Sequence, residues 1–398
     1  MRAQPWLPVA LIWAAFGVAH AVSVALGFVW PNGPMGDTYL VYEPWSEMAL
    51  GGYGIVGVDM PWVYPPLALA PMVIAQGLVW FESYSMAWAA LVCIANAVGF
   101  WALVRDGESR SRVIAGGYWA LFTLLLGPIA IYRIDAITVP LAVIGMLWLR
   151  SRPGLAGAVL SIATWIKVWP AALLLAAVCA VRRRKEVVIG AALASVVIAG
   201  VVVLAGGAGN LFGFVTEQTG RGLQIEAVAA TPFMVMAQTG SHAVYYDTDI
   251  LTYQVAGPGI AEVASAMTLV MVIAVAGIAA LGTWKSRRGA SVVELLPPLA
   301  LALVTALIVT NKVGSPQFES WFIAPIVWWI VWDRRRAMPL AILALVIAAL
   351  THVIYPLAYT QILLTEAPAI AVLVLRNVAL VALGIWAVVR VVRVPARG

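Results

Sequence analysis

Residues 7–29 read LPVALIWAAFGVAHAVSVALGFV and contain no charged side chain. At about 1.5 Å per residue, a helix of this length can cross the hydrocarbon layer of a membrane. Soon after it, residues 36–52 read GDTYLVYEPWSEMALGG and carry three carboxylates, Asp37, Glu43 and Glu47. The side of the membrane on which these acids lie decides what chemistry they can perform.

The whole chain shares this apolar character. Its 398 residues are 63% hydrophobic and 11% charged, with a mean hydropathy of +0.96. No water-soluble domain of this size needs so much apolar surface, so we predict an all-α, polytopic transmembrane helical bundle that forms one domain over residues 1–398. The net charge of +6 is explained by basic cytoplasmic loops, and no nucleic-acid partner is expected.

Two local patterns are given structural interpretations. The tripeptide Ala19-His20-Ala21 could be a signal-peptidase site, but residues 7–29 are long enough to remain as a membrane anchor. Cys93 and Cys179 both lie within apolar runs, where a thiol is usually packing, so we expect neither a disulfide nor a redox role.

The basic residues occur in clusters whose spacing predicts the topology. The clusters are Arg2, Arg105 to Arg112, Arg150 and Arg152, Arg182 to Lys185, Lys285 to Arg288, Arg334 to Arg336, and Arg390 to Arg397. If all of them are cytoplasmic, each segment between two clusters must leave the cytoplasm and return. This requirement predicts about twelve crossings of the plasma membrane. Both termini are then cytoplasmic.

Segment lengths refine this topology. Residues 113–149 are long enough for a hairpin that turns near Arg133 and Asp135. Residues 154–181 contain Lys167 and Pro170 in mid-run, which favours two short helices broken on the outer side. We further expect crossings within 86–206 and 259–388. The external segment 207–258 is expected to form amphipathic helices over the outer face, or alternatively a solvated loop.

One stretch conflicts with a simple count. Residues 64–104 could form two spans, which would place Arg105 to Arg112 outside. The simpler interpretation makes YPPLALAPM, residues 64–72, part of an interfacial or re-entrant helix within a first external loop of residues 30–85. Residues 86–104 are then the true crossing.

The resulting layout sorts the charges. The Lys and Arg residues outside the cytoplasmic clusters are Arg133, Lys167, Arg221, Lys312 and Arg376. Of the 18 acids, only Asp106, Glu108, Glu186, Glu294 and Asp333 fall on the cytoplasmic side. The predicted outer face therefore combines many carboxylates with a few isolated cations.

Such a set suits transfer of a sugar from a lipid-linked phosphate. A carboxylate can accept the proton of an attacking hydroxyl, and Arg or Lys can stabilise a departing phosphate. Asp37 is the candidate base, although an Asp before an apolar run is also a common helix N-cap. Arg133, Lys167, Lys312 and Arg221 are candidate phosphate ligands. The alternatives are a hairpin-tip salt bridge between Arg133 and Asp135, and snorkelling for the two lysines.

Other residues have weaker claims to the site. Glu43 and Glu47 share one helix face that could simply be solvated, and Asp59 has the position of a turn residue. Arg376 is expected to be paired inside the bundle. We expect no metal and no cofactor, because His20, His242 and His352 are scattered and there is no Gly-rich phosphate loop. The supporting candidates are Asp135, Asp59, Glu43, Tyr64, Gln224, Glu226, Gln317 and His352.

Several motifs occur in order. They are GDTYLVYEPWSEMALGG and YPPLALAP, then YRIDAITVP, TWIKVWP, RGLQIEAVAATP and NKVGSPQF. Together they resemble the GT-C superfamily of integral-membrane glycosyltransferases, and within it the polyprenol-phosphate-mannose-dependent family of actinobacteria that includes PimE. The resemblance runs from about residue 36 to residue 321, and beyond it only generic helices are similar.

The resemblance implies a shared plan. An aspartate in the first external loop is the base of this superfamily, and Asp37 holds that position. The YPP segment corresponds to a juxtamembrane helix, Arg133 and Asp135 to an Arg-x-Asp element, and Lys167 to the Lys of an Ile-Lys-x-x-Pro element. Val63 and Phe318 depart from the family pattern, which bears on the acceptor more than on the reaction.

The implied reaction is inverting transfer of mannose from a polyprenyl-phosphate donor of the decaprenyl-phosphate-mannose type. The expected acceptor is a membrane glycolipid of the phosphatidylinositol mannoside or lipomannan type, on the periplasmic or extracellular side and among membrane lipids. Two alternatives stay open. One is the same fold with polyprenyl-phosphate arabinose, and the other is a transporter or flippase of lipid-linked sugars, which would show internal inverted repeats.

Overall fold

The computed structural model describes residues 6–105, 109–217, 220–248 and 250–396. Arg2, Asp106, Glu108 and Arg397, which entered the predicted charge pattern, lie outside these ranges.

The described chain is a bundle of helices with one β-hairpin, which confirms the all-α class. Its helices are α1 (Trp6–Val29), α2 (Glu43–Leu50), α3 (Leu69–Gln76), α4 (Tyr84–Val104), α5 (Arg110–Leu126), α6 (Asp135–Trp148), α7 (Pro153–Ile166), α8 (Ala171–Ala180), α9 (Arg184–Leu204), α10 (Gly213–Thr216), α11 (Thr231–Ala237), α12 (Ile260–Arg287), α13 (Val292–Val309), α14 (Ile323–His352), α15 (Tyr359–Leu363) and α16 (Ala367–Arg393); the strands are β1 (Ala243–Asp247) and β2 (Thr252–Ala256).

Within the described ranges, 8 helical stretches are long and apolar enough to cross a membrane. One of them contains α14, which bends at Asp333, where φ is −146° and ψ is 78°. The shorter helices α6, α7 and α8 are also apolar. The two legs of α14, these three short helices and the other long helices are compatible with the expected twelve crossings, which remain a prediction.

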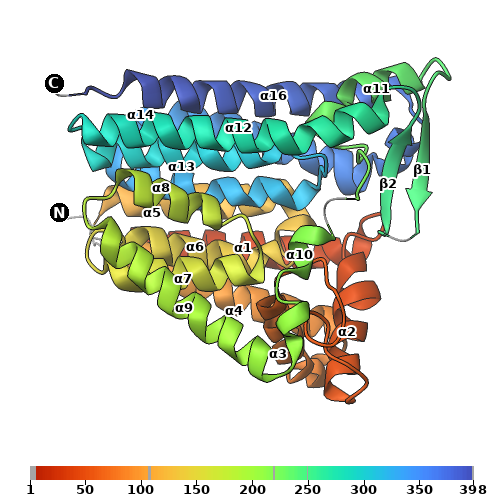
Figure 1. The fold of residues 1–398 in the computed structure, drawn as a ribbon, viewed down its shortest axis with the longest axis horizontal. Helices are drawn as coiled ribbons and strands as arrows, with labels where there is room; N and C mark the ends of the chain where they lie inside the picture. Colours follow the sequence, from red (N-terminus) through yellow and green to blue (C-terminus); the bar gives the residue numbers. More distant parts are fainter. Residues whose placement is uncertain (1–5, 106–108, 218–219, 249, 397–398) are drawn as a thin grey trace.

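The helix axes run roughly parallel in Figure 1. The start of α1 and the end of α16 lie at one end of the bundle, while α2, α10 and the β-hairpin gather at the other. The connections at this second end include the α5–α6 turn and the α7–α8 break, both located where the sequence predicted them. We call this second end the loop end.

The YPP segment is short, as predicted. A 3₁₀ turn, Pro66–Ala68, leads into α3, and together they span Pro66–Gln76, too short to cross a bilayer as a single helix. Helix α4 then begins at Tyr84, and Ser83 caps it by accepting a hydrogen bond from the Met86 N–H at 3.3 Å. The segment between α1 and α4 therefore ends where the candidate span Tyr84–Val104 starts.

Segment 207–258 differs from the predicted amphipathic helices. Helices α10 and α11 are only 4 and 7 residues long, and strands β1 and β2 pair antiparallel with Tyr246 opposite Tyr253. Aromatic and β-branched residues dominate both strands, and such residues favour a pleated, half-buried surface over a helix. The hairpin lies at the loop end in Figure 1.

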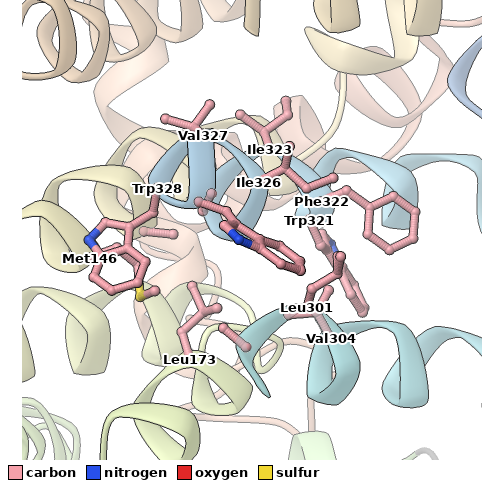
Figure 2. Close-up of a cluster of buried hydrophobic side chains, with 14 of the residues drawn as sticks. Met146, Leu173, Leu301, Val304, Trp321, Phe322, Ile323, Ile326, Val327 and Trp328 are labelled. Carbon is pink, nitrogen blue, oxygen red and sulfur yellow. The ribbon is translucent and has the colours of Figure 1, made fainter. Parts of the chain in front are cut away.

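The bundle owes its rigidity to one large apolar core. Trp321, Phe322, Ile326 and Trp328 project from α14 and the turn before it, toward Leu301 of α13 and side chains of neighbouring helices (Figure 2). Close packing of this kind is expensive to disturb, because buried side chains interlock in single rotamers. The loops at the loop end are therefore carried by a firm scaffold.

Helices α7 and α9 approach closely through glycines. A Cβ atom at Gly157 would collide with the backbone of Val187, and one at Gly190 would collide with the backbone of Gly154. Small residues allow such backbone contact between membrane helices, where packing replaces the hydrophobic effect as the driving force. This contact fixes α7, whose C-terminal end carries Lys167.

Candidate active site

A cavity of about 790 Å³ opens at the loop end. It is lined by nine of the predicted site residues, Asp37, Tyr64, Arg133, Lys167, Arg221, Gln224, Glu226, Lys312 and Gln317. These residues come from the segment between α1 and α4, the α5–α6 turn, the α7–α8 break, the 221–226 segment and the loop after α13. The fold thus brings together motifs that are far apart in the sequence.

Asp37 precedes a π-helical turn, Thr38–Tyr42, but its side chain makes no capping hydrogen bond. Its Oδ1 instead lies 3.2 Å from a guanidinium nitrogen of Arg133, and the Tyr42 hydroxyl donates to its Oδ2 at 3.3 Å. The Asp37 side chain remains 31% exposed. The carboxylate is therefore held by two partners and still faces the cavity, so the helix-cap alternative is wrong.

Arg133 is buried in the α5–α6 turn, with its guanidinium 5.8 Å from the centre of the Tyr355 ring. Burial disfavours its positive charge, but Asp37 and the surrounding tyrosines together raise the pKa of Arg133. The alternative of a salt bridge between Arg133 and Asp135 does not form, because Arg133 pairs with Asp37 and Asp135 faces Lys167. The two side chains point to different partners.

Asp135 is fully buried behind the cavity wall. Its Oδ1 accepts a hydrogen bond from the Trp321 indole at 2.6 Å, and its Oδ2 lies 4.0 Å from the Lys167 ammonium. The same ammonium lies 4.2 Å from the centre of the Tyr64 ring. Burial lowers the pKa of Lys167, while Asp135 acts in the opposite direction. Asp135 thus positions two residues that line the cavity without lining it itself.

Lys312 and Arg221 form a second cationic group. Burial lowers the pKa of Lys312, and the nearby charge of Arg221 lowers it further. Burial also lowers the pKa of Arg221. The Lys312 carbonyl accepts a hydrogen bond from the Gln224 N–H at 3.0 Å, which ties the two segments together. Two like charges that disfavour each other in one cavity form a suitable place for an anion.

Arg376 is paired inside the bundle, as expected. Its guanidinium lies 2.9 Å from Glu319 and 3.4 Å from Glu226, and the side chains of all three are almost fully buried. Desolvation raises the pKa of Glu226 to about 7, against the opposing effect of Arg376. This triad fixes the 221–226 segment to α16 and to the turn before α14.

Three predicted residues lie away from the cavity. Asp59 accepts a hydrogen bond from the Ile55 N–H at 2.7 Å and is a turn residue. Glu43 is partly exposed beside Glu47, whose charge adds to the desolvation that raises the pKa of Glu43. His352 donates from Nδ1 to the Leu125 carbonyl at 3.1 Å, and its ring fills the space beside Gly127. None of these three lines the cavity, so a role for them in the site stays a prediction without support from its geometry.

The sequence prediction missed an aromatic wall. Trp169 and Trp321 stack at 5.6 Å with only 8° between their planes, and Phe318 stacks on Trp321 at 4.3 Å. All three line the cavity. Trp169 and Phe318 lie within the quoted motifs TWIKVWP and NKVGSPQF, which could have indicated this wall. The chain contains 18 tryptophans, so no single one stood out.

Within the described ranges, no three His, Cys, Asp or Glu side chains form a group that could hold a metal ion.

The chain was also compared with known proteins. Residues 62–311, well over half of the chain, match the sequence profile of Glycosyltransferase family 87. The chain belongs to this family. No curated protein and no solved structure matches it.

Membership of glycosyltransferase family 87 establishes the enzyme class. The chain is a membrane glycosyltransferase, and the matched range includes Arg133, Asp135, Lys167, Arg221 and Glu226. Lys312 is the residue directly after the matched range, and Asp37 lies 25 residues before its start at residue 62. For these two residues the support is their position in the same cavity as the matched cations.

Proposed function

We propose that this family 87 glycosyltransferase transfers mannose, with inversion, from a polyprenyl-phosphate donor to a glycolipid or lipoglycan on the outer face of the membrane. The proposal takes mannose and the phosphatidylinositol mannoside type of acceptor from the sequence resemblance. The lipid-phosphate donor has separate support in the shape and charge of the cavity.

The observation that carries the proposal is that charged groups and exposed apolar side chains line one cavity. Besides its cations, the cavity is lined by Val168, Val215 and Leu251, which are 45%, 54% and 57% exposed, and by Thr268 and Met271 of α12. Met271 lies about 17 Å along α12 from its start at Ile260. Since α12 is a candidate span with little buried surface, we infer that the cavity extends along α12 to the depth of the hydrocarbon layer, where an isoprenoid chain could enter.

The charges support a division of tasks. Arg133 is engaged by Asp37, so we assign it to orienting and stabilising the base rather than to the phosphate. Lys312 and Arg221 have the mutual repulsion that a phosphate would relieve. Lys167, held by Asp135 between these groups, is assigned to the phosphate or to the sugar beside it.

The proposed reaction is one displacement. The acceptor hydroxyl gives its proton to Asp37 while its oxygen forms a bond to C1 of the sugar. The bond between C1 and the phosphate oxygen breaks, and its electron pair leaves with the polyprenyl phosphate. The cations stabilise this added negative charge. Attack on the face opposite the phosphate converts a β-linked donor into an α-glycoside.

The proposed location follows from charge. The described basic clusters, including Arg182 to Lys185 and Lys285 to Arg288, occur in connections at the end of the bundle opposite the cavity. The positive-inside rule assigns that end to the cytoplasm. The cavity then faces outward, where lipid-linked sugars are available and nucleotide sugars are not.

The test is transfer by purified protein in liposomes containing synthetic polyprenyl-phosphate mannose and a glycolipid acceptor. Asp37→Asn should lower kcat by roughly 10²- to 10⁴-fold, because general-base catalysis contributes about that much. Glu47→Gln, a change at an exposed carboxylate of the following helix, is the matched control and should keep wild-type activity. A folded Asp37→Asn protein that transfers mannose at the wild-type rate would exclude Asp37 as the base.

The donor sugar requires its own comparison. The same liposomes loaded with polyprenyl-phosphate arabinose should give little product if mannose is the natural sugar. Movement of either labelled donor across the bilayer without a glycolipid product would instead support a transporter.

A further inference from the structure

We infer that Tyr42 is a positioning residue of the reaction, which holds the Asp37 carboxylate in its reactive orientation by donating a hydrogen bond to Oδ2. This inference rests on the proposed role of Asp37 as the base. Tyr42 does not line the cavity and would not contact either substrate.

The direction of the hydrogen bond follows from the partners of Tyr42. Its hydroxyl oxygen accepts a hydrogen bond from the Ile134 backbone N–H at 3.0 Å. The hydroxyl then donates its proton to Asp37 Oδ2 at 3.3 Å, and the Tyr64 side chain is a further hydrogen-bond partner of Tyr42. An ionised carboxylate only accepts, so the phenol must donate to it. Burial raises the pKa of Tyr42 well above its ordinary value, so the phenol keeps this proton.

A rare backbone element creates this contact. In an α-helix, residues five positions apart lie about 140° apart around the axis, so Asp37 and Tyr42 would diverge. Here Thr38–Tyr42 is a π-helical turn, closed by a hydrogen bond from the Glu43 N–H to the Thr38 carbonyl. This i→i+5 geometry brings residues five apart onto one side. Such turns are uncommon and often occur at functional sites.

The surroundings leave Tyr42 one orientation. Its side chain is fully buried, and its ring packs against Trp88 with centroids 4.7 Å apart. Trp88 is itself fixed by a hydrogen bond from its indole to the Ile131 carbonyl at 3.1 Å. Ile131 and Ile134 flank Arg133 in the α5–α6 turn. This turn therefore supplies both groups that hold Asp37, Arg133 directly and Ile134 through Tyr42.

Each carboxylate oxygen of Asp37 thus has its own partner, an ion pair with Arg133 at Oδ1 and a hydrogen bond from Tyr42 at Oδ2. Arg133 holds Oδ1 and Tyr42 holds Oδ2, which stops rotation of the carboxylate and leaves its remaining lone pairs facing the cavity. The other titratable or charged groups that act on this region are Tyr64, Asp135, Lys167, Tyr246 and Tyr355. All of these remain in a Tyr42 variant, so a change in pH dependence can be attributed to the lost hydroxyl.

The experiment measures kcat/KM for mannosyl transfer against pH. Tyr42→Phe keeps the ring and removes the donor, so the carboxylate is less stabilised in its charged form. The acidic limb of the profile should move up by about one pH unit, with kcat/KM reduced about tenfold or more on that limb. Tyr84→Phe is the control, because Tyr84 is another buried tyrosine that donates to a carbonyl, of Met72 at 2.9 Å. The Tyr84→Phe variant should leave the acidic limb of the pH profile unchanged.

A second variant covers the case in which Tyr42→Phe does not fold. Incorporation of 2,3-difluorotyrosine at position 42 keeps the hydroxyl and makes it a stronger donor, so the acidic limb should move down. An unchanged limb in the fluorinated protein, or in a folded Tyr42→Phe protein, would overturn the inference. These results are distinct from failure of the proposed function, in which the wild-type protein itself would form no product from polyprenyl-phosphate mannose.

Discussion

The Asp37 carboxylate lies 3.2 Å from the Arg133 guanidinium, although the two residues belong to separate connections of the bundle. This ion pair joins the loop after α1 to the α5–α6 turn at the edge of the cavity. It gives the proposed base a counter-charge before any substrate binds. Under the proposed function, this pairing leaves the phosphate of the donor to Lys312, Arg221 and Lys167.

Arg133→Lys should be a costly change. A lysine keeps the charge but lacks the planar fork of arginine, so it cannot reach Asp37 and keep its position over Tyr355 at the same time. We expect kcat/KM to fall by roughly tenfold to a hundredfold, because the ion pair that orients the charged base is weakened. The donor KM should change less than kcat, because the phosphate is bound elsewhere. A larger effect on the donor KM than on kcat would indicate that Arg133 binds the phosphate of the donor.

Lys312→Ala and Arg221→Ala should weaken binding of the donor phosphate. Each variant loses a cation that would contact the phosphate in both the ground state and the transition state, so the donor KM should rise and kcat should fall. A combined loss of roughly tenfold to a hundredfold in kcat/KM is expected for each. Lys185→Ala, which changes an exposed lysine at the start of α9, is the control for net charge. Inhibition by free polyprenyl phosphate should weaken in the two site variants and not in the control.

Asp135→Asn should damage stability as well as activity. The substitution leaves the buried Lys167 ammonium without its carboxylate partner at 4.0 Å, and it weakens the acceptor of the Trp321 hydrogen bond. Removal of one partner of a buried ion pair costs about 3–5 kcal/mol. Thermal unfolding in detergent should therefore shift to lower temperature. The double variant Asp135→Asn/Lys167→Met should regain much of the stability without regaining activity, and a double variant as active as the wild type would remove Lys167 from the site.

Glu226 should make stability depend on pH. Its pKa is about 7 in the fold, above the ordinary value of 4.5. Between these values the folded state holds a proton that the unfolded state has lost. Its contribution therefore decreases as pH rises from 4.5 to 7, by roughly 1.4 kcal/mol per pH unit, and is constant above that range. Glu226→Gln cannot ionise, so its stability relative to the wild type should improve between pH 5 and pH 8. A difference that stays constant over this range would contradict the assignment.

The sequence predicted the scaffold better than the details of the site. The lengths of the apolar runs and the positions of the basic clusters predicted the hairpin turn at Arg133 and the break at Lys167. A helix needs a minimum length to cross a membrane, and a charged side chain is costly inside it, so both features can be located from one sequence. Pairings across the bundle were not accessible. Nothing in the spacing of Arg133 and Asp135 indicates that one turns to Asp37 and the other to Trp321. The π-helical turn that aligns Tyr42, and the β-hairpin of residues 243–256, also depend on tertiary contacts that periodicity does not contain.

The lateral side of the cavity gives the sharpest test of the lipid donor. Met271 lines the cavity from α12, whereas Leu269, two positions earlier, is 63% exposed and does not line it. Met271→Trp should narrow the entrance and raise the KM for a long polyprenyl donor. A donor with a chain of two or three isoprene units should be affected much less, because its shorter tail fills less of the passage. Leu269→Trp adds the same bulk to the outer side of the helix and should change neither value. If Met271→Trp raised the KM of short and long donors equally, α12 would border the sugar and its phosphate rather than the isoprenoid chain.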